Sequence, residues 1–178
     1  MKTITTFFLV FYSLVYAYSK KELISDYQNK NFKKVCIDGA ISDSKDEAIL
    51  SLVGNACLKI DAINPLGIIV KRLVSTPKYR ENASYFATIL LQKKLIYQFM
   101  NDGIDLKSIR LPRTSNILSV VFENIIKKNY RVIDRNKNKI EISIGNKKYI
   151  LWRSNDNPPK VFIDEYKDGI LLKTHWYL

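Results

Sequence analysis

The sequence predicts an α+β fold, in which an N-terminal antiparallel array of helix pairs packs against a C-terminal antiparallel meander of four to five strands. Between residues 21 and 129, apolar residues recur at steps of three and four, the period of a helix with one buried face. From residue 130 onward they alternate with polar residues, the period of a strand. No glycine- or proline-rich linker separates the halves, so we expect the sheet to pack on the helices.

The helical half starts with two short helices that a longer one follows. A break at residues 29–31 separates the two short helices, and a turn is expected at residues 39–44. Ser44 is the candidate N-cap of the next helix, because its hydroxyl can accept a hydrogen bond from a free backbone N–H. The apolar face of that helix ends near Ile60.

Proline marks the start of the next two helices, because its fixed φ suits the first helical turn. Pro65 opens one of them, and Pro77 opens the longest helix, which is expected at about residues 78–100. A last helix covers about residues 117–126. Short helices joined by tight turns are antiparallel neighbours by default, which predicts helix pairs.

The C-terminal half consists of short segments in which apolar residues alternate. The expected strands are residues 130–133, 139–144, 147–152, 161–166 and 170–177. In the second strand Ile140, Ile142 and Ile144 fall on one side, which predicts a sheet with one buried face. Gly145 and Asn146 form a two-residue hairpin signal between the second and third strands.

The N-terminal residues have the three-part pattern of a secretory signal. Lys2 precedes an apolar run from Ile4 to Val15, and Ala17 follows as a small residue at the position that a signal peptidase reads. The run of about 12 residues is shorter than the roughly 20 that a helix needs to cross a membrane. A retained membrane anchor is therefore the weaker alternative.

The expected domains are a signal peptide at residues 1–17, a helical, repeat-like region at 18–129 and a β-meander region at 130–178. Lysine, isoleucine and asparagine are abundant, which is typical of an AT-rich genome and favours a bacterial source. We therefore expect the chain to be secreted to the periplasm, with no integral membrane segment in the mature protein.

Cys36 and Cys57 are predicted to form a disulfide, because they are the only cysteines and exported thiols are normally oxidised. Closing this loop contributes roughly 3 kcal/mol in the chain-entropy model. A redox-active pair would need closer spacing. A structural zinc needs four ligands, and His175 is the only histidine that could add to the two thiols.

The formal net charge of +12 bears first on solubility and association, because lysine pairs scattered along a chain are usually solvated surface; only as the alternative does it indicate an anionic partner. Export makes nucleic acid an improbable one, and leaves cell-wall polymers, lipid headgroups and acidic protein surfaces. Catalytic motifs are absent: there is no nucleophile elbow and no zinc-protease helix. Asp164 and Glu165 cannot serve as a carboxylate pair, since adjacent strand residues point to opposite faces. We expect no enzyme, no cofactor and no metal.

Aromatic residues are concentrated in the predicted sheet. The candidate interaction surface consists of Tyr149, Trp152, Tyr166 and Trp176. Core packing explains most of these aromatic residues; those that are exposed among lysines suit a protein interface or a groove for carbohydrate or peptide. The leading hypothesis is a periplasmic, non-enzymatic scaffold or accessory subunit that binds another periplasmic or envelope protein. The alternative is a cell-envelope binding module for an anionic polymer such as peptidoglycan, and an enzyme with an unrecognised site, tested at His175, is third.

The helical half carries a cue of repeat proteins, with Tyr27 and Phe32 before a second helix and Gly54, Ala56 and Cys57 in the next. In this it resembles helical-repeat scaffolds of the tetratricopeptide or Sel1 type, in which helix pairs stack into a curved binding surface. In composition and size the chain is also similar to small uncharacterised periplasmic proteins of AT-rich spiral bacteria, some of which are accessory parts of the flagellar motor. Both resemblances imply protein–protein interaction.

Overall fold

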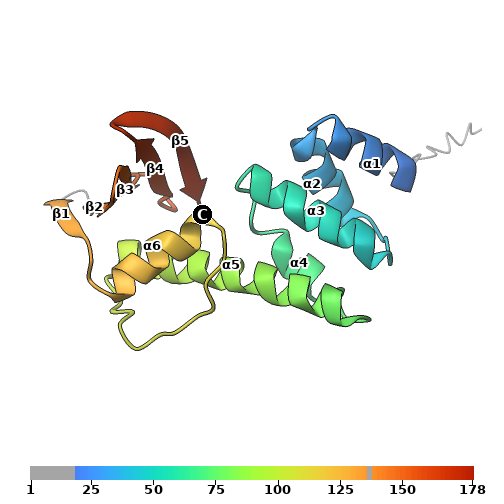
Figure 1. The fold of residues 1–178 in the computed structure, drawn as a ribbon, viewed down its shortest axis with the longest axis horizontal. Coiled ribbons are helices and arrows are strands. Elements are labelled where there is room, and N and C mark those ends of the chain that lie inside the picture. The colour runs from blue at the N-terminus through green and yellow to red at the C-terminus, as the bar shows by residue number, and fades with distance from the viewer. Residues whose placement is uncertain (1–18, 136–137) are drawn as a thin grey trace, which may run out of the picture.

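The computed structural model describes residues 19–135 and 138–178, and the expected signal peptide at residues 1–17 lies outside them. In the described part the helices come first and the strands second, and the strands form one antiparallel sheet, which is the predicted α+β fold (Figure 1). The helices are α1 (Lys20–Gln28), α2 (Phe32–Ile41), α3 (Glu47–Lys59), α4 (Leu66–Val70), α5 (Pro77–Asp102) and α6 (Ile117–Ile126). The strands are β1 (Arg131–Asp134), β2 (Lys139–Ile144), β3 (Lys147–Arg153), β4 (Val161–Lys167) and β5 (Ile170–Tyr177).

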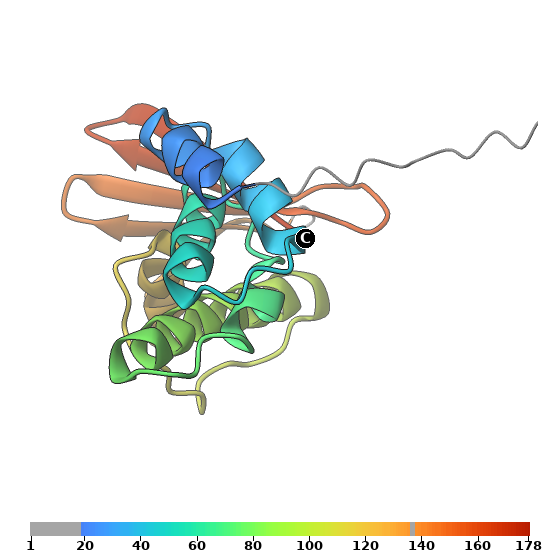
Figure 2. The same ribbon diagram turned by 90° about the vertical axis from the view of Figure 1, so that its right-hand side faces the viewer.

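The long helix α5 runs under both halves of the molecule. α1 to α4 lie above one end of it, and α6 and the sheet lie above the other (Figure 1). In the view turned by 90°, α1, α2 and α3 stand in front of the sheet while α5 runs beneath (Figure 2). Thr76 caps α5 by accepting a hydrogen bond from the N–H of Tyr79 at 3.3 Å, and Gly103 ends it with a φ of 69°. No described helix is both long and apolar enough to span a membrane.

The predicted disulfide between Cys36 and Cys57 is present and joins α2 to α3. Both cysteines are fully buried. Asp46, and not the predicted Ser44, caps α3: one carboxylate oxygen of Asp46 accepts from the N–H of Ala48 at 3.0 Å and of Ile49 at 3.3 Å. A carboxylate also favours the positive end of the helix, which explains the choice of cap.

The turn predicted at residues 39–44 is wrong in its first half, because α2 continues through Gly39 to Ile41. Gly39 serves helix packing and not a turn. A Cβ at this position would lie 2.4 Å from a methyl carbon of Val53 on α3, so only glycine allows the two helices to approach this closely. The chain leaves the helix at Ser42, whose hydroxyl donates to the carbonyl oxygen of Gly39.

The sheet is a meander in the order β1-β2-β3-β4-β5, and its register divides it into two faces. Ile140, Leu151, Ile163 and His175 lie opposite one another on neighbouring strands, and all four are buried. We call this the inner face. Ile144 belongs to the same face but remains 42% exposed, because it lies at the hairpin end of β2, beyond the cover of the helices.

The inner face packs against the helical half, as expected, and forms one continuous apolar core with it. Hydrogen bonds from side chains join the two halves at α5. The Tyr97 hydroxyl donates to the carbonyl oxygen of Pro159 at 2.9 Å, and the Asn138 amide donates to the carbonyl oxygen of Met100 at 3.0 Å. The opposite face of the sheet, here called the outer face, therefore points away from the helices.

Candidate functional site: the outer face of the sheet

Three aromatic side chains form a row across the outer face. Trp152 on β3 lies opposite Phe162 on β4, which lies opposite Trp176 on β5. The rings of Trp152 and Phe162 stack with centroids 4.1 Å apart and planes 7° from parallel. Trp176 continues the row and is 51% exposed. These three residues, here called the aromatic row, give the outer face an apolar surface on which Trp176 is exposed and the stacked rings of Trp152 and Phe162 are half-buried.

A carboxylate holds the row in place. Asp164 on β4 accepts a hydrogen bond from the indole N–H of Trp152 at 2.9 Å and another from the hydroxyl of Thr174 on β5 at 2.7 Å. These bonds link three strands and fix the orientation of the Trp152 ring. Glu165, the next residue, lies on the inner face and pairs with Lys147, so the two carboxylates point to opposite faces, as the alternation predicts.

Lysines lie over two rings of the outer face, the half-buried Tyr166 and the exposed Trp176. The Nζ atom of Lys148 is 5.1 Å from the ring centre of Tyr166, and that of Lys160 is 5.7 Å from the ring centre of Trp176. Both distances are typical of cation–π contacts, and the ammonium group of Lys160 also pairs with Asp156 at 3.3 Å. The outer face therefore combines aromatic rings with positive charge.

A pocket of about 390 Å³ lies at the β3 end of the aromatic row. Its lining consists of Lys139, Trp152, Arg153, Ser154 and Asn155. Trp152 is thus both stacked on Phe162 and part of a hollow with two cationic neighbours. A partner's acidic or polar side chain could enter this hollow next to the row.

The structure places three of the four predicted surface residues on the outer face, namely Trp152, Tyr166 and Trp176. Tyr149 does not belong to this surface. It is only 4% exposed and lies on the inner face opposite Ile142, because its odd position on β3 alternates with that of Trp152. Phe162 takes its place in the row.

Sequence reasoning did not select Phe162 or Asp164, although a signal was present. Phe162, Asp164 and Tyr166 are spaced by two in β4, which places them on one face opposite the buried Val161 and Ile163. The spacing shows that they share a face, but not which residue of β3 lies beside each of them. That pairing depends on the register.

The outer edge of the sheet is also apolar. At the start of β5, Ile170 is 68% exposed, Leu171 50% and Leu172 55%. Among the described residues β5 pairs only with β4, and no described strand lies along its other edge. Large aliphatic side chains on a free strand edge mark either an aggregation hazard or a site for a partner.

A buried polar cluster fixes β5 to the helical half. The carboxylate of Asp61, which follows α3, contacts three side chains of β5. It lies 2.9 Å from the Nδ1 atom of His175 and 2.7 Å from the Nζ atom of Lys173, and it accepts a hydrogen bond from the hydroxyl of Tyr177 at 3.3 Å. Burial alone would raise the pKa of Asp61, but the hydrogen bonds from His175 and Lys173 outweigh it and hold the pKa below its usual value. The Nε2 atom of His175 is buried without a hydrogen-bond partner, 3.8 Å from Glu165. His175 thus faces the interior, where it positions β5.

A second buried contact holds the end of β5. The Nζ atom of Lys93 on α5 donates to the side-chain oxygen of Asn64 at 2.6 Å and to the carbonyl oxygen of Leu178. Burial lowers the pKa of Lys93 to about 8. Lys93 also lines a pocket of about 230 Å³ between residues 60–65 and 176–178. The end of β5 is therefore anchored by Lys93 at the border of this hollow.

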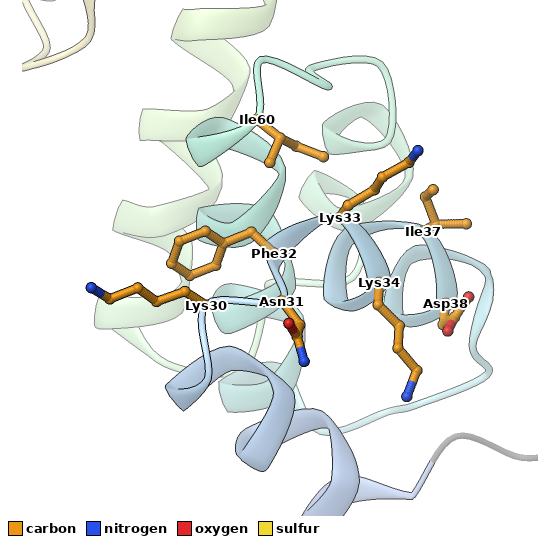
Figure 3. Close-up of a pocket in the computed structure, with 8 residues that line it drawn as sticks. All are labelled: Lys30, Asn31, Phe32, Lys33, Lys34, Ile37, Asp38 and Ile60. Carbon is orange, nitrogen blue, oxygen red and sulfur yellow. The ribbon is translucent and has the colours of Figure 1, made fainter.

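A broad hollow of about 680 Å³ lies on α2, lined by Lys30, Asn31, Phe32, Lys33, Lys34, Ile37, Asp38 and Ile60 (Figure 3). Three lysines around a hollow would suit an anion if their ammonium groups converged. In Figure 3 the side chains of Lys30, Lys33 and Lys34 point in three different directions. Lys34 is also engaged by Asp26 at 2.8 Å. The α2 hollow is therefore a positively charged surface and not a closed anion pocket.

The described residues contain no candidate metal site, because no three of their histidine, cysteine, aspartate and glutamate side chains lie close enough together to bind an ion. What the outer face offers is apolar area, fixed aromatic rings and positive charge. Comparison of the chain with protein-family models, with curated proteins and with solved structures gives no match.

Proposed function

We propose that this chain is an exported, non-enzymatic interaction protein that binds another envelope protein through the outer face of its sheet. The observation that carries the proposal is the aromatic row, which stays exposed at Trp176 and continues along β5 into exposed aliphatic residues. Exposed aromatic and aliphatic side chains with a charged rim are typical of protein interfaces. The rigid bracing of Trp152 by Asp164 lowers the entropy lost when a partner binds.

The geometry favours a protein over a glycan. A sugar ring binds to the flat face of an aromatic ring, but Trp152 and Phe162 turn one face each toward the other. The aliphatic side chains of Leu171 and Leu172 beside the row suit a protein surface, but they have neither the hydrogen-bonding groups nor the flat ring that a sugar binds. The positive charge of the α2 hollow suits an acidic protein segment and an anionic polymer such as peptidoglycan alike, so this charge does not decide between them.

Site-specific crosslinking in the native cell tests the proposal. A photoreactive benzoylphenylalanine replaces Trp176 in one variant and Tyr166 in another, and a third carries it at the exposed Lys78 on α5 as a control. The two outer-face positions should capture the same protein, and the control position should not. A further substitution, Trp176→Ser, should weaken binding of the purified captured protein by about 30-fold, the effect of losing one interface tryptophan.

Two results would count against a protein partner. One is the absence of a shared product from both outer-face positions. The other is salt-sensitive sedimentation of the protein with purified peptidoglycan sacculi that Trp176→Ser abolishes, which would favour the polymer. Export is tested separately by N-terminal sequencing and thiol labelling of native material: a chain that begins at Met1 with reactive thiols would contradict it.

A further inference from the structure

The free edge of β5 is unprotected over a regular stretch of strand. Apart from β4, no described residue forms a hydrogen bond with the backbone of Ile170–Tyr177. The register slips by one residue at Leu172, so the stretch that pairs regularly is Lys173–Tyr177. Natural edge strands are usually guarded by charged residues or proline. Here the single charge, Lys173, is committed to Asp61 at 2.7 Å.

The space beside this edge borders the helical half. Figure 1 shows β5 as the strand on the side of α2 and α3. The pocket of about 230 Å³ at Trp176–Leu178 includes Ile60, and Ile60 also lines the α2 hollow. Ile60 thus lies between a hollow at the end of β5 and a hollow on α2. An extended segment that paired with β5 would have this surface on its other side.

The charges along this surface favour an acidic occupant. Lys30 and Lys33 are exposed on the α2 hollow, and neither forms an ion pair with a described residue. The whole chain has a net charge of +12, so two copies brought together at this edge would repel each other. A partner segment with acidic residues would instead be attracted.

We propose that an extended acidic segment of the partner adds to the free edge of β5 as a further strand. Main-chain hydrogen bonds to Lys173–Tyr177 supply affinity, apolar side chains of the segment contact Leu172 and Trp176, and its acidic side chains face Lys30 and Lys33. This inference rests on the proposed function and specifies how the partner binds.

The test uses a library of labelled octapeptides that carry glutamate at every second position and valine, leucine, isoleucine, phenylalanine or tyrosine at the others. Members of the library should bind the full mature chain, and hydrogen exchange should slow at Lys173–Tyr177 on binding. The same peptides with N-methylated alternate residues should bind at least about tenfold more weakly, since they lack the N–H donors of one edge. Peptides with lysine in place of glutamate should not bind.

A matched pair of variants tests the charge. Lys33→Glu and Lys78→Glu make the same change at the second residue of a helix, α2 and α5 respectively. Lys33→Glu should weaken binding of the glutamate peptides about tenfold, and Lys78→Glu should leave it unchanged.

Three results would overturn the inference: no binding by any library member at about 1 mM, equal binding of the N-methylated peptides, or a dimer of the chain itself with slowed exchange at β5. These failures are separate from failure of the proposed function, because crosslinking from Trp176 and Tyr166 reports on the outer face and does not depend on strand pairing.

Discussion

Removal of the Cys36–Cys57 disulfide should cost about 3 kcal/mol of unfolding free energy. The bond closes a loop with a sequence separation of 21 residues. The chain-entropy relation for a loop of this size gives about 11 cal/mol/K, or about 3 kcal/mol at about 25 °C, by which the closed loop destabilises the unfolded chain. A domain of this size has a total stability of about 5–15 kcal/mol, so the reduced protein should remain folded but with a small margin.

The assay is urea unfolding of the mature chain followed by far-UV circular dichroism, with and without reductant. The reductant should lower the midpoint of the oxidised wild-type protein and raise the slope m, because a chain without the loop exposes more surface when it unfolds. The double variant Cys36→Ala/Cys57→Ala is the control, and the reductant should not change its curve. A loss below about 1 kcal/mol in the wild type, with m unchanged, would refute the loop-closure reasoning.

Two further predictions concern packing and charge. Gly54→Ala should cost about 1–3 kcal/mol in the same unfolding assay, because a Cβ there would lie 2.5 Å from the buried ring of Phe86. Gly67→Ala is the matched control and should be neutral or slightly stabilising, since its nearest neighbour is a methyl carbon of Leu90 at 3.6 Å; equal losses at both glycines would contradict the packing argument. Asp61→Asn removes the charge that the histidine and the lysine of β5 bind, and should cost about 1–3 kcal/mol at neutral pH. The pKa of Asp61 is lowered in the folded state, so the stabilisation by its carboxylate is present above the unfolded value of about 3.9 and is lost as pH falls through the folded pKa. The difference in unfolding free energy between wild type and variant should therefore narrow below about pH 4. A difference that widens there would contradict the assignment.

The spacing of apolar residues alone was enough to predict the architecture, because helices and strands with one buried face each have a characteristic spacing in the sequence. The alternation in residues 139–144 and the hairpin signal at Gly145 led to a meander, and the register pairs Ile144 with Lys147 across that turn. The disulfide followed from the count of cysteines. These features are local or have a single solution, so no three-dimensional information was needed.

The features that could not be predicted depend on contacts between distant segments. Glycine is a common turn residue, and only the proximity of Val53 shows that Gly39 serves helix packing. Tyr149 is as aromatic as its neighbours, but which face of the sheet meets the helices is decided by tertiary packing. The cluster around Asp61 joins residues more than a hundred positions apart, such as Asp61 and His175, and nothing near Asp61 in the sequence announces it.

The uninterrupted course of α5 has a mechanical consequence. Its 26 residues extend about 39 Å, enough to pass beneath both the disulfide-linked helices and the sheet without a joint. A load applied by a partner at β5 would therefore be carried through one continuous rod, and the molecule should melt in one calorimetric step in spite of its two differently built ends. Such a body would act as a stiff spacer that holds whatever binds at the sheet at a constant angle to whatever touches the helices.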